Sequence, residues 1–340
     1  MKRIGRYTLE LETKPRILAS AALGGKKESE GPLRQDFDQT FSDTMMGTSS
    51  WEQAEAIMQK EALGLAIAKA GITAEDVDLV FAGDLLNQCI SSTFGLRDFN
   101  IPFLGQYGAC STMAQTLLMS SLMVESGAAR IAAAVTSSHF CSAERQFRLP
   151  LEYGGQRTPT AQWTATASGS AIVTNRGEIQ IEHVMPGKIV DLGIKDAANM
   201  GAAMAPAAAN SYADYFKDTG TSPQDYDAIF TGDLGKVGSS LLEKLLLEEG
   251  INIAGKHKDC GLMIYDLEGQ DVHAGASGCG CSASVLCGHI LKNMRDKSGK
   301  YKNILFAATG ALMSPTSTQQ GESIPGIAHI VHLRTCQDLT

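Results

Sequence analysis

Residues 101–115 read IPFLGQYGACSTMAQ, and this stretch organises the rest of the chain. An apolar run ends at Tyr107 and Gly108, Cys110 follows, and a helical pattern begins at Ser111. A cysteine at a strand-to-helix turn lies where the N–H groups of the helix N-terminus favour the thiolate. Two interpretations stay open at this point: a side chain that faces a ligand pocket, and a buried, inert thiol, which is common for cysteine.

Composition and length place the chain among ordinary globular proteins. It has 340 residues, 44% of them hydrophobic and 19% charged, enough for one large domain or two smaller ones. A net charge of −8 gives no global basic footprint for nucleic acid. We find no signal peptide and no apolar run of membrane-spanning length, so we expect at most peripheral contact with a membrane. The eight cysteines lack metal or disulfide spacing, and we predict reduced thiols, no metal and no cofactor.

The first half alternates apolar runs with helical patterns. Buried strands are predicted at 17–23, 79–82, 130–137, 168–173 and 179–183, helices at 50–71 and 111–125, and a long loop at 24–49. Residues 138–148 carry His139, Arg145 and Arg148 just past a strand end, which is where parallel sheets bind ligands. A solvated loop with a surface ion pair is the alternative interpretation of this segment.

The second half repeats the first. Residues 76–85 read DVDLVFAGDL and residues 225–234 read DYDAIFTGDL, so both begin with two spaced aspartates and end with Gly-Asp-Leu. A repeat near 150 residues is too long for a solenoid and implies two duplicated α/β halves, which we place at 1–175 and 176–340. Further helices are predicted at 203–216, 238–249 and 272–294, and strands within 225–234, at 260–265 and, as the last core strand, at 303–308.

Two motifs resemble the thiolase and ketoacyl-synthase superfamily. Gly-Ala-Cys-Ser at 108–111 lies where that superfamily carries its acyl-accepting cysteine, and residues 273–278 (HAGASG) resemble the thiolase His-Pro-x-Gly-x-Ser-Gly motif. The resemblance implies a thiolase-like α/β fold with a layered αβαβα core, and a homodimer by analogy. It also implies an alternative function, a Cys-dependent acyltransferase in which His273 lowers the pKa of Cys110.

The rest of the condensing machinery is missing from the sequence. Residues 307–312 read AATGAL where thiolases have a second cysteine in a Cys-x-Gly-Gly-Gly loop. Residues 231–235 read TGDLG where synthases of the fatty-acid type have a histidine and an asparagine. Asp233 would repel the negative charge that develops in such a reaction. We therefore predict the fold without the chemistry, and no enzyme activity.

A closer resemblance covers nearly the whole chain. The motifs are AGDLLNQ at 82–88, TSSH at 136–139, AERQFR at 143–148, AMAPAA at 203–208, DCGLMIY at 259–265 and ATGALMSP at 308–315. Together they resemble the stage V sporulation protein AD family. That resemblance implies a dipicolinic acid-binding component of the machinery that moves dipicolinate and calcium into the developing spore. It also implies docking on membrane-embedded stage V A proteins, peripheral to the forespore inner membrane, with dipicolinate bound alone or as its calcium chelate.

Dipicolinate is flat, aromatic and doubly anionic, so its site needs donors for two carboxylates and a dry slot for the ring. We predict a slot with Cys110 at its base. Carboxylate partners are predicted in Arg145 and Arg148, whose guanidinium groups bind bidentately, and a further donor in His139.

The role of Asp84 stays open. It could hold calcium, it could orient Asn87 and backbone donors, or it could cap a turn, as its repeat-related twin Asp233 suggests. His273 remains a candidate for the same pocket, although a histidine hydrogen-bonded to backbone at a helix start is the simpler interpretation. A third function class, a structural scaffold with an unused pocket, also stays open.

Overall fold

The computed structural model describes residues 1–147 and 157–336, and ten of its strands form two sets of five. The first set, in the order β6-β5-β7-β9-β3, comprises β3 (Arg16–Gly24), β5 (Leu79–Gly83), β6 (Phe103–Gly105), β7 (Ala132–Ser138) and β9 (Ala167–Thr174). The second set, in the order β12-β11-β14-β15-β10, comprises β10 (Ile179–Met185), β11 (Ala228–Thr231), β12 (His257–Asp259), β14 (Asn303–Ala311) and β15 (Gly326–Thr335).

The two sets have the same topology. In the first, β5 is parallel to β6 and β7, while β9 is antiparallel to β7 and β3. In the second, β11 is parallel to β12 and β14, while β15 is antiparallel to β14 and β10. They meet where Ile179 of β10 pairs with Ile17 of β3. The predicted division at 175 and 176 falls in the turn between β9 and β10.

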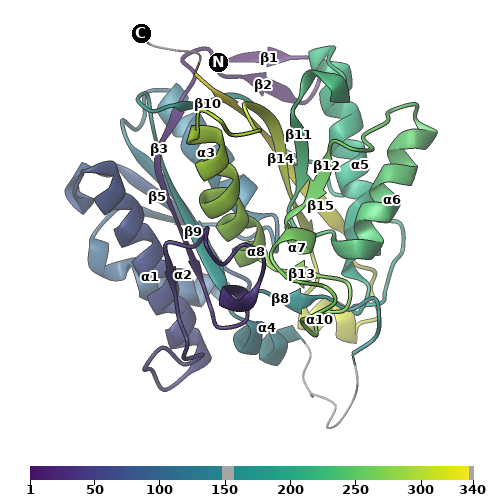
Figure 1. The fold of residues 1–340 in the computed structure, drawn as a ribbon, viewed down its shortest axis with the longest axis horizontal. Coiled ribbons are helices and arrows are strands. Elements are labelled where there is room, and N and C mark those ends of the chain that lie inside the picture. Colours follow the sequence, from purple (N-terminus) through teal and green to yellow (C-terminus); the bar gives the residue numbers. More distant parts are fainter. Residues whose placement is uncertain (148–156, 337–340) are drawn as a thin grey trace.

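Helices form three layers around these strands (Figure 1). One outer layer holds α1 (Trp51–Ala70) and α2 (Ile90–Leu96), and the other holds α5 (Met200–Thr219) and α6 (Gly235–Glu248). The central layer holds α3 (Thr112–Glu125), α8 (Cys279–Ser284), the π-helical η6 (Val285–Ile290) and α9 (Leu291–Arg295). Helix α3 contacts β5, β7 and β9 on one side and β14 and β15 on the other. This arrangement confirms the predicted αβαβα core.

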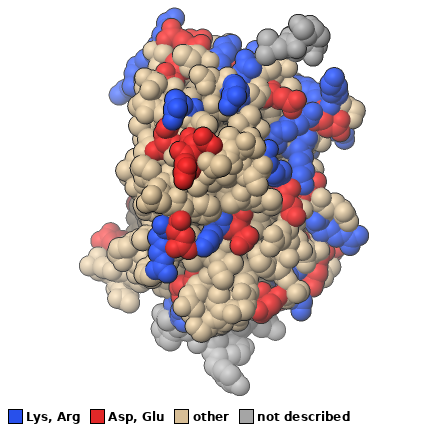
Figure 2. Space-filling model, turned by 90° about the vertical axis from the view of Figure 1, so that its left-hand side faces the viewer, with Lys and Arg blue, Asp and Glu red and all other residues tan. Residues whose placement is uncertain are grey.

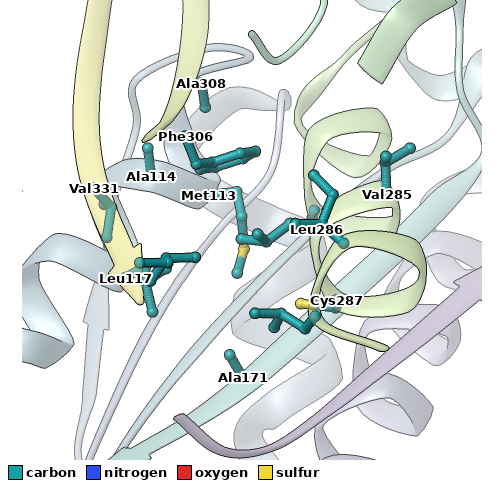
Figure 3. Close-up of a cluster of buried hydrophobic side chains, with 14 of the residues drawn as sticks. Met113, Ala114, Leu117, Ala171, Val285, Leu286, Cys287, Phe306, Ala308 and Val331 are labelled. Carbon is teal, nitrogen blue, oxygen red and sulfur yellow. The ribbon is translucent and has the colours of Figure 1, made fainter. Parts of the chain in front are cut away.

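The central helices are apolar nearly all round because both of their sides are covered by strands. Figure 3 shows Met113 of α3, Leu286 of η6 and Phe306 of β14 pointing toward one another, and all three side chains are fully buried. The packing of this layer fixes the start of α3, and with it Cys110, relative to the second half.

Local signals in the sequence set the bounds of the first helix. The Ser50 side chain accepts a hydrogen bond from the backbone N–H of Gln53 at the start of α1, and Gly71, at φ 68°, ends the helix. Both features confirm the prediction for 50–71.

Two predicted elements are wrong. Residues 260–263 form a short helix, α7 (Cys260–Met263), because a brief apolar run fits a buried helix as well as a strand. The last core strand is β15, which lies in the middle of the sheet. Residues 140–147, for which no element was predicted, form α4 (Phe140–Phe147), so the alternative interpretation of this segment as a solvated loop does not hold. The remaining elements are β1 (Lys2–Ile4), β2 (Thr8–Glu10), β4 (Gln39–Thr40), β8 (Trp163–Thr164), β13 (Ala276–Ser277), α10 (Pro315–Gln319) and short 3₁₀ turns.

The surface carries charge of both signs. Figure 2 shows the side of the molecule that carries α1 and α2, where basic side chains gather along the upper right-hand edge and acidic and basic groups alternate elsewhere. Within residues 1–147 and 157–336, no helix combines the length and apolar character needed to cross a membrane.

Candidate functional site

Cys110 lies in a tight turn between β6 and α3. The preceding Ala109 has a φ of 50°, which is uncommon for a residue with a side chain. The Ser111 hydroxyl donates to the carbonyl of Gly108 at 2.6 Å. Gly310 of β14 packs so closely that a Cβ there would lie 2.3 Å from that same carbonyl oxygen. The second half therefore holds the cysteine turn in place, and only glycine fits at 310.

The Cys110 thiol faces polar groups from the second half. Its Sγ lies 3.8 Å from the Ser277 hydroxyl, which in turn donates to Asp233 at 3.3 Å. Asp233 also accepts from the Gly278 N–H at 2.9 Å and from the Thr309 hydroxyl at 2.9 Å. Burial raises the pKa of the Cys110 thiol well above its usual value, and the neighbouring Asp233 raises it further. Burial also raises the pKa of Asp233, to about 6. At neutral pH the site therefore holds a neutral thiol beside a carboxylate.

A small cavity, which we call the thiol pocket, opens above Cys110. Its lining is Leu85, Tyr107, Ala109, Cys110, Ala143, Glu144, Phe147, Thr164, Met200, Ser277, Ala311 and Met313. Within the described residues this lining contains no lysine, arginine or histidine. Its volume of about 40 Å³ has room for about one water molecule. A ligand with a ring and two carboxylates enters only if the walls move apart.

A larger cavity, the α4 cleft, lies on the other side of α4. It has a volume of about 690 Å³ and is lined by Ser50, Glu52, Gln53, Ala56, Leu86, Asn87, Gln88, Ile90, Phe94, Ser142, Arg145, Gln146 and Pro315. This volume falls in the range of small-molecule sites. Arg145 forms an ion pair with Glu52, and its guanidinium carbon lies 5.2 Å from the centre of the Trp51 ring. The cleft thus offers an arginine and several amide groups to a ligand.

One glutamine joins α4 to the loop after β5, the two segments that separate these cavities. The Gln146 side chain of α4 accepts from the backbone N–H of Asn87 at 2.9 Å and donates to the Leu85 carbonyl at 3.1 Å. Leu85 lines the thiol pocket and Asn87 lines the α4 cleft. Gln146 therefore clamps α4 to the loop after β5.

Asp84 lines neither cavity. It accepts from the Leu86 N–H at 2.9 Å, the Ser92 N–H at 2.8 Å and the Ser92 hydroxyl at 2.6 Å, so it shapes the loop and anchors the start of α2. Burial raises its pKa. Its contacts are those of a cap, one of the roles that the sequence leaves open.

A second buried carboxyl, Glu55 of α1, lies close to Asp84. It accepts from the Ser137 hydroxyl at 3.0 Å and from the Ser142 hydroxyl of α4 at 2.8 Å. Burial and the nearby Asp84 raise the pKa of Glu55 to about 8. Among the described residues, no group of three or more His, Cys, Asp or Glu side chains is arranged to hold a metal ion.

The predicted histidines lie away from the thiol. His139 is buried, with Nε2 2.9 Å from the Thr44 carbonyl oxygen and Nδ1 accepting from the Cys141 N–H at 3.2 Å; burial lowers its pKa. His273 has a φ of 53°, and its two ring nitrogens lie 2.7 Å from the Thr158 carbonyl oxygen and 2.9 Å from Asp271. Neither histidine lines the thiol pocket or the α4 cleft.

The structure thus brings some predicted residues together and separates others. Asn87 and Arg145 share the α4 cleft, whereas Cys110 lines the thiol pocket on the other side of α4. Arg148 lies outside the described residues. The sequence prediction missed Ser277, Glu55 and Gln146. The Gly-Asp-Leu repeat pointed at the first of these indirectly, because it marked Asp233, which Ser277 contacts.

Comparison with known proteins gives a consistent family. Residues 5–334 match the family model of Stage V sporulation protein AD. A Bacillus subtilis (strain 168) protein of that name is 46% identical over 330 residues, which is 97% of this chain and 97% of that protein.

Solved structures show the fold alone, since the identities are low. 3-Oxoacyl-[acyl-carrier-protein] synthase III from Aquifex aeolicus VF5 is 13% identical, with a TM-score of 0.56 over 94% of this chain and 99% of that one. Cerulenin-bound OleA from Xanthomonas campestri (12%, TM-score 0.60) and human mitochondrial 3-ketoacyl-CoA thiolase in complex with CoA (12%, TM-score 0.59) each cover 96% of this chain and 100% of their own. The fold is therefore thiolase-like.

Proposed function

The chain belongs to the stage V sporulation protein AD family, and from this premise we propose that it is a non-catalytic binding protein for dipicolinate (pyridine-2,6-dicarboxylate) in sporulation. The observation that carries the non-catalytic part is the position of the buried Cys110 thiol, next to Ser277 and the Asp233 carboxyl that Ser277 contacts, where burial and Asp233 raise the thiol pKa. An acyl-accepting cysteine has to reach the thiolate, and here burial and a carboxylate both oppose that state.

The alternative, an acyltransferase, needs a base for Cys110 and donors for an oxyanion. His273 is engaged with Thr158 and Asp271 and does not line the thiol pocket. Ser277 and Asp233 are the polar groups next to the thiol, and the Asp233 carboxylate disfavours a developing negative charge. These features support binding over turnover.

The proposed binding site is a slot formed when α4 and the loop after β5 move apart. Cys110 lies at the base of the thiol pocket, Asn87 and Arg145 line the α4 cleft, and the Gln146 clamp lies between them. Breaking the two Gln146 hydrogen bonds joins the cavities into one slot. The pyridine ring then packs in the apolar part near Cys110, and the carboxylates reach Asn87 and Arg145.

Charge is the main difficulty for a doubly anionic ligand in this slot. Arg145 is paired with Glu52, and a ligand carboxylate competes with that pairing. Calcium bound by the two carboxylates and the ring nitrogen removes most of the repulsion from nearby acids such as Glu144 and Asp233. We therefore propose that calcium strengthens binding. His139 and His273 line neither of the two cavities, so their positions do not support the predicted contacts with the ligand.

Two partners complete the proposal. The edge strand β6 exposes Phe103 and Leu104, 37% and 47% accessible, and no described strand pairs with its outer edge. An unpaired apolar edge suits a second copy of the same strand across a two-fold axis, which gives a homodimer. We further propose docking on membrane-embedded stage V A proteins at the forespore inner membrane, which is what the sequence resemblance implies.

Calorimetric titration with dipicolinate tests this function. We expect binding of dipicolinate, tighter with calcium, and rejection of pyridine-3,5-dicarboxylate. In the 2,6 isomer both carboxylates flank the ring nitrogen, and moving them leaves donors unpaired at a cost of about 1–3 kcal/mol each. Equal affinity for both isomers, or release of CoA from acyl-CoA that depends on Cys110, would contradict the proposal.

A further inference from the structure

A second large cavity lies at the end of the sheet opposite Cys110. It opens where the two halves join, between the start of β3 at Arg16, the start of β14 at Asn303 and the end of β15 at Thr335. Its volume is about 740 Å³, in the range of small-molecule sites. We call it the junction cavity.

Basic side chains dominate its lining. Arg16, Arg295, Lys297, Lys302 and Arg334 face two acids, Glu178 and Asp227, in a chain with a net charge of −8. The carboxylate of Asp227 is already engaged by the backbone N–H groups of Lys302 and Asn303, at 2.7 and 2.8 Å. The cavity is therefore a local positive region on an acidic protein.

Arg295 is the most buried of these cations. Its Nη1 donates to the Ser20 hydroxyl at 3.0 Å, while its Nη2 is buried and has no hydrogen-bond partner among the described residues. Burial lowers the pKa of this guanidinium, against the opposing effects of Cys287, Glu178 and Asp38. Because Nη2 has almost no accessible surface, an anion in the cavity acts on the charge of the guanidinium, and it reaches Nη2 only when the Arg295 side chain shifts.

The neighbouring cations are also available to an anion. Lys302 donates from Nζ to the backbone carbonyls of Met294 and Asp296, which are neutral acceptors and leave its charge in place. Lys297 is exposed and takes part in none of the ion pairs found within the described residues. Arg334 lies 4.0 Å from Glu182, at the limit of an ion pair.

We propose that the junction cavity binds a phosphate group, with Arg295 and Lys297 as its principal partners. Guanidinium and ammonium groups at this density match a multiply charged oxyanion. The phosphate can belong to a soluble ion or ester or to the headgroup of an anionic lipid. This site is separate from the dipicolinate slot, and neither proposal depends on the other.

The test uses the full chain and two probes. Inorganic phosphate and pyrophosphate are titrated by calorimetry, and vesicles of phosphatidylcholine with or without phosphatidylglycerol are used for co-sedimentation. The variants are Lys297→Glu, Arg295→Gln and, as a matched control on the exposed surface of α6, Lys244→Glu. Melting curves verify that each variant is folded, and Lys297→Glu keeps the test valid if Arg295→Gln does not fold.

We expect Lys297→Glu to weaken binding by at least about ten-fold and Lys244→Glu to leave it unchanged. Added salt weakens binding as well. Phosphate binding without vesicle binding assigns a soluble anion, and vesicle binding that requires phosphatidylglycerol assigns a lipid headgroup. The proposal is overturned if neither probe binds, or if Lys244→Glu and Lys297→Glu weaken binding equally. Dipicolinate affinity of Lys297→Glu should equal that of the unmodified protein, which separates this test from that of the slot.

Discussion

The hydroxyl of Ser277 lies 3.8 Å from the Sγ of Cys110, although the two residues are 167 positions apart. Cys110 comes from the turn before α3 in the first half, and Ser277 comes from β13 in the second. The duplicated fold therefore brings a cysteine and a serine together, where the resemblance to the thiolase motif implies that His273 lies beside the cysteine. A hydroxyl is a poor base, so the pair suits ligand contact more than nucleophilic attack.

The reactivity of the Cys110 thiol should be low and should depend on Asp233. We expect iodoacetamide to alkylate Cys110 much more slowly at pH 8 than the half-buried Cys141 and Cys336. Asp233→Asn removes the neighbouring charge and should raise the rate at Cys110, by about ten-fold for each unit by which the thiol pKa falls.

Peptide mass spectrometry over time measures both rates, with Cys141 as the internal control for Asp233→Asn. Because the pKa of Asp233 is about 6, the effect of the variant should fade below pH 6. Fast alkylation of Cys110 in the unmodified protein would contradict a neutral, buried thiol.

The Gln146 clamp should limit entry of dipicolinate. Gln146→Ala removes two hydrogen bonds, so we expect faster association by several-fold and a loss of about 1–2 kcal/mol in the free energy of unfolding. Stopped-flow binding and denaturant titration measure the two effects, and the exposed Gln224→Ala is the control. An unchanged association rate in folded Gln146→Ala would show that the clamp does not gate the slot.

Glu55 should make stability depend on pH. Its folded-state pKa, about 8, lies above the ordinary value of 4.5, so the folded state retains a proton that the unfolded state releases. The free energy of unfolding should therefore fall as the pH rises from about 4.5 to about 8. Glu55→Gln mimics the protonated form. The free energy of unfolding of this variant, minus that of the unmodified protein, should therefore be about 1–3 kcal/mol larger at pH 8 than at pH 5.

Denaturant titrations at the two pH values measure that difference. The control is Glu61→Gln, an exposed change on the same helix, which should show no such trend. A constant difference between Glu55→Gln and the unmodified protein across this range would mean that Glu55 is ionised in the folded state.

Pairing of two β6 edges predicts a homodimer that a single charge disrupts. Leu104→Lys places two lysines near the two-fold axis, and we expect the molar mass from light scattering to halve. Leu247→Lys on α6 makes the same change at another exposed leucine and should leave the mass unchanged. A monomeric unmodified protein would rule out this interface.

Patterning in the sequence predicts most of the fold. The Asp84 and Asp233 repeat indicates the duplication, and the cap at Ser50 sets the start of α1. Strand β15 was missed because its exposed and buried positions do not alternate, and α7 was mistaken for a strand because it has a single turn.

The site was harder to predict than the fold because its contacts cross between the halves. Nothing near Cys110 in the sequence points to Ser277, and the motif around His273 does not reveal the backbone at φ 53° that accompanies its contacts with Thr158 and Asp271. Asp84 and Asp233 are equivalent in the repeat, yet Asp84 caps a loop and Asp233 faces the thiol. Tertiary packing, which sequence spacing does not encode, makes this difference.

Dipicolinate titration of two substitutions at Cys110 tests the account most directly. Cys110→Ser keeps the volume and a hydrogen-bond donor, so binding should weaken by less than about 1.5 kcal/mol, as for near-isosteric changes. Cys110→Leu fills the base of the slot, and we expect binding to be lost while a cooperative melting curve shows that the variant is folded. Intact binding by folded Cys110→Leu would contradict the account, because the ligand would then lie elsewhere.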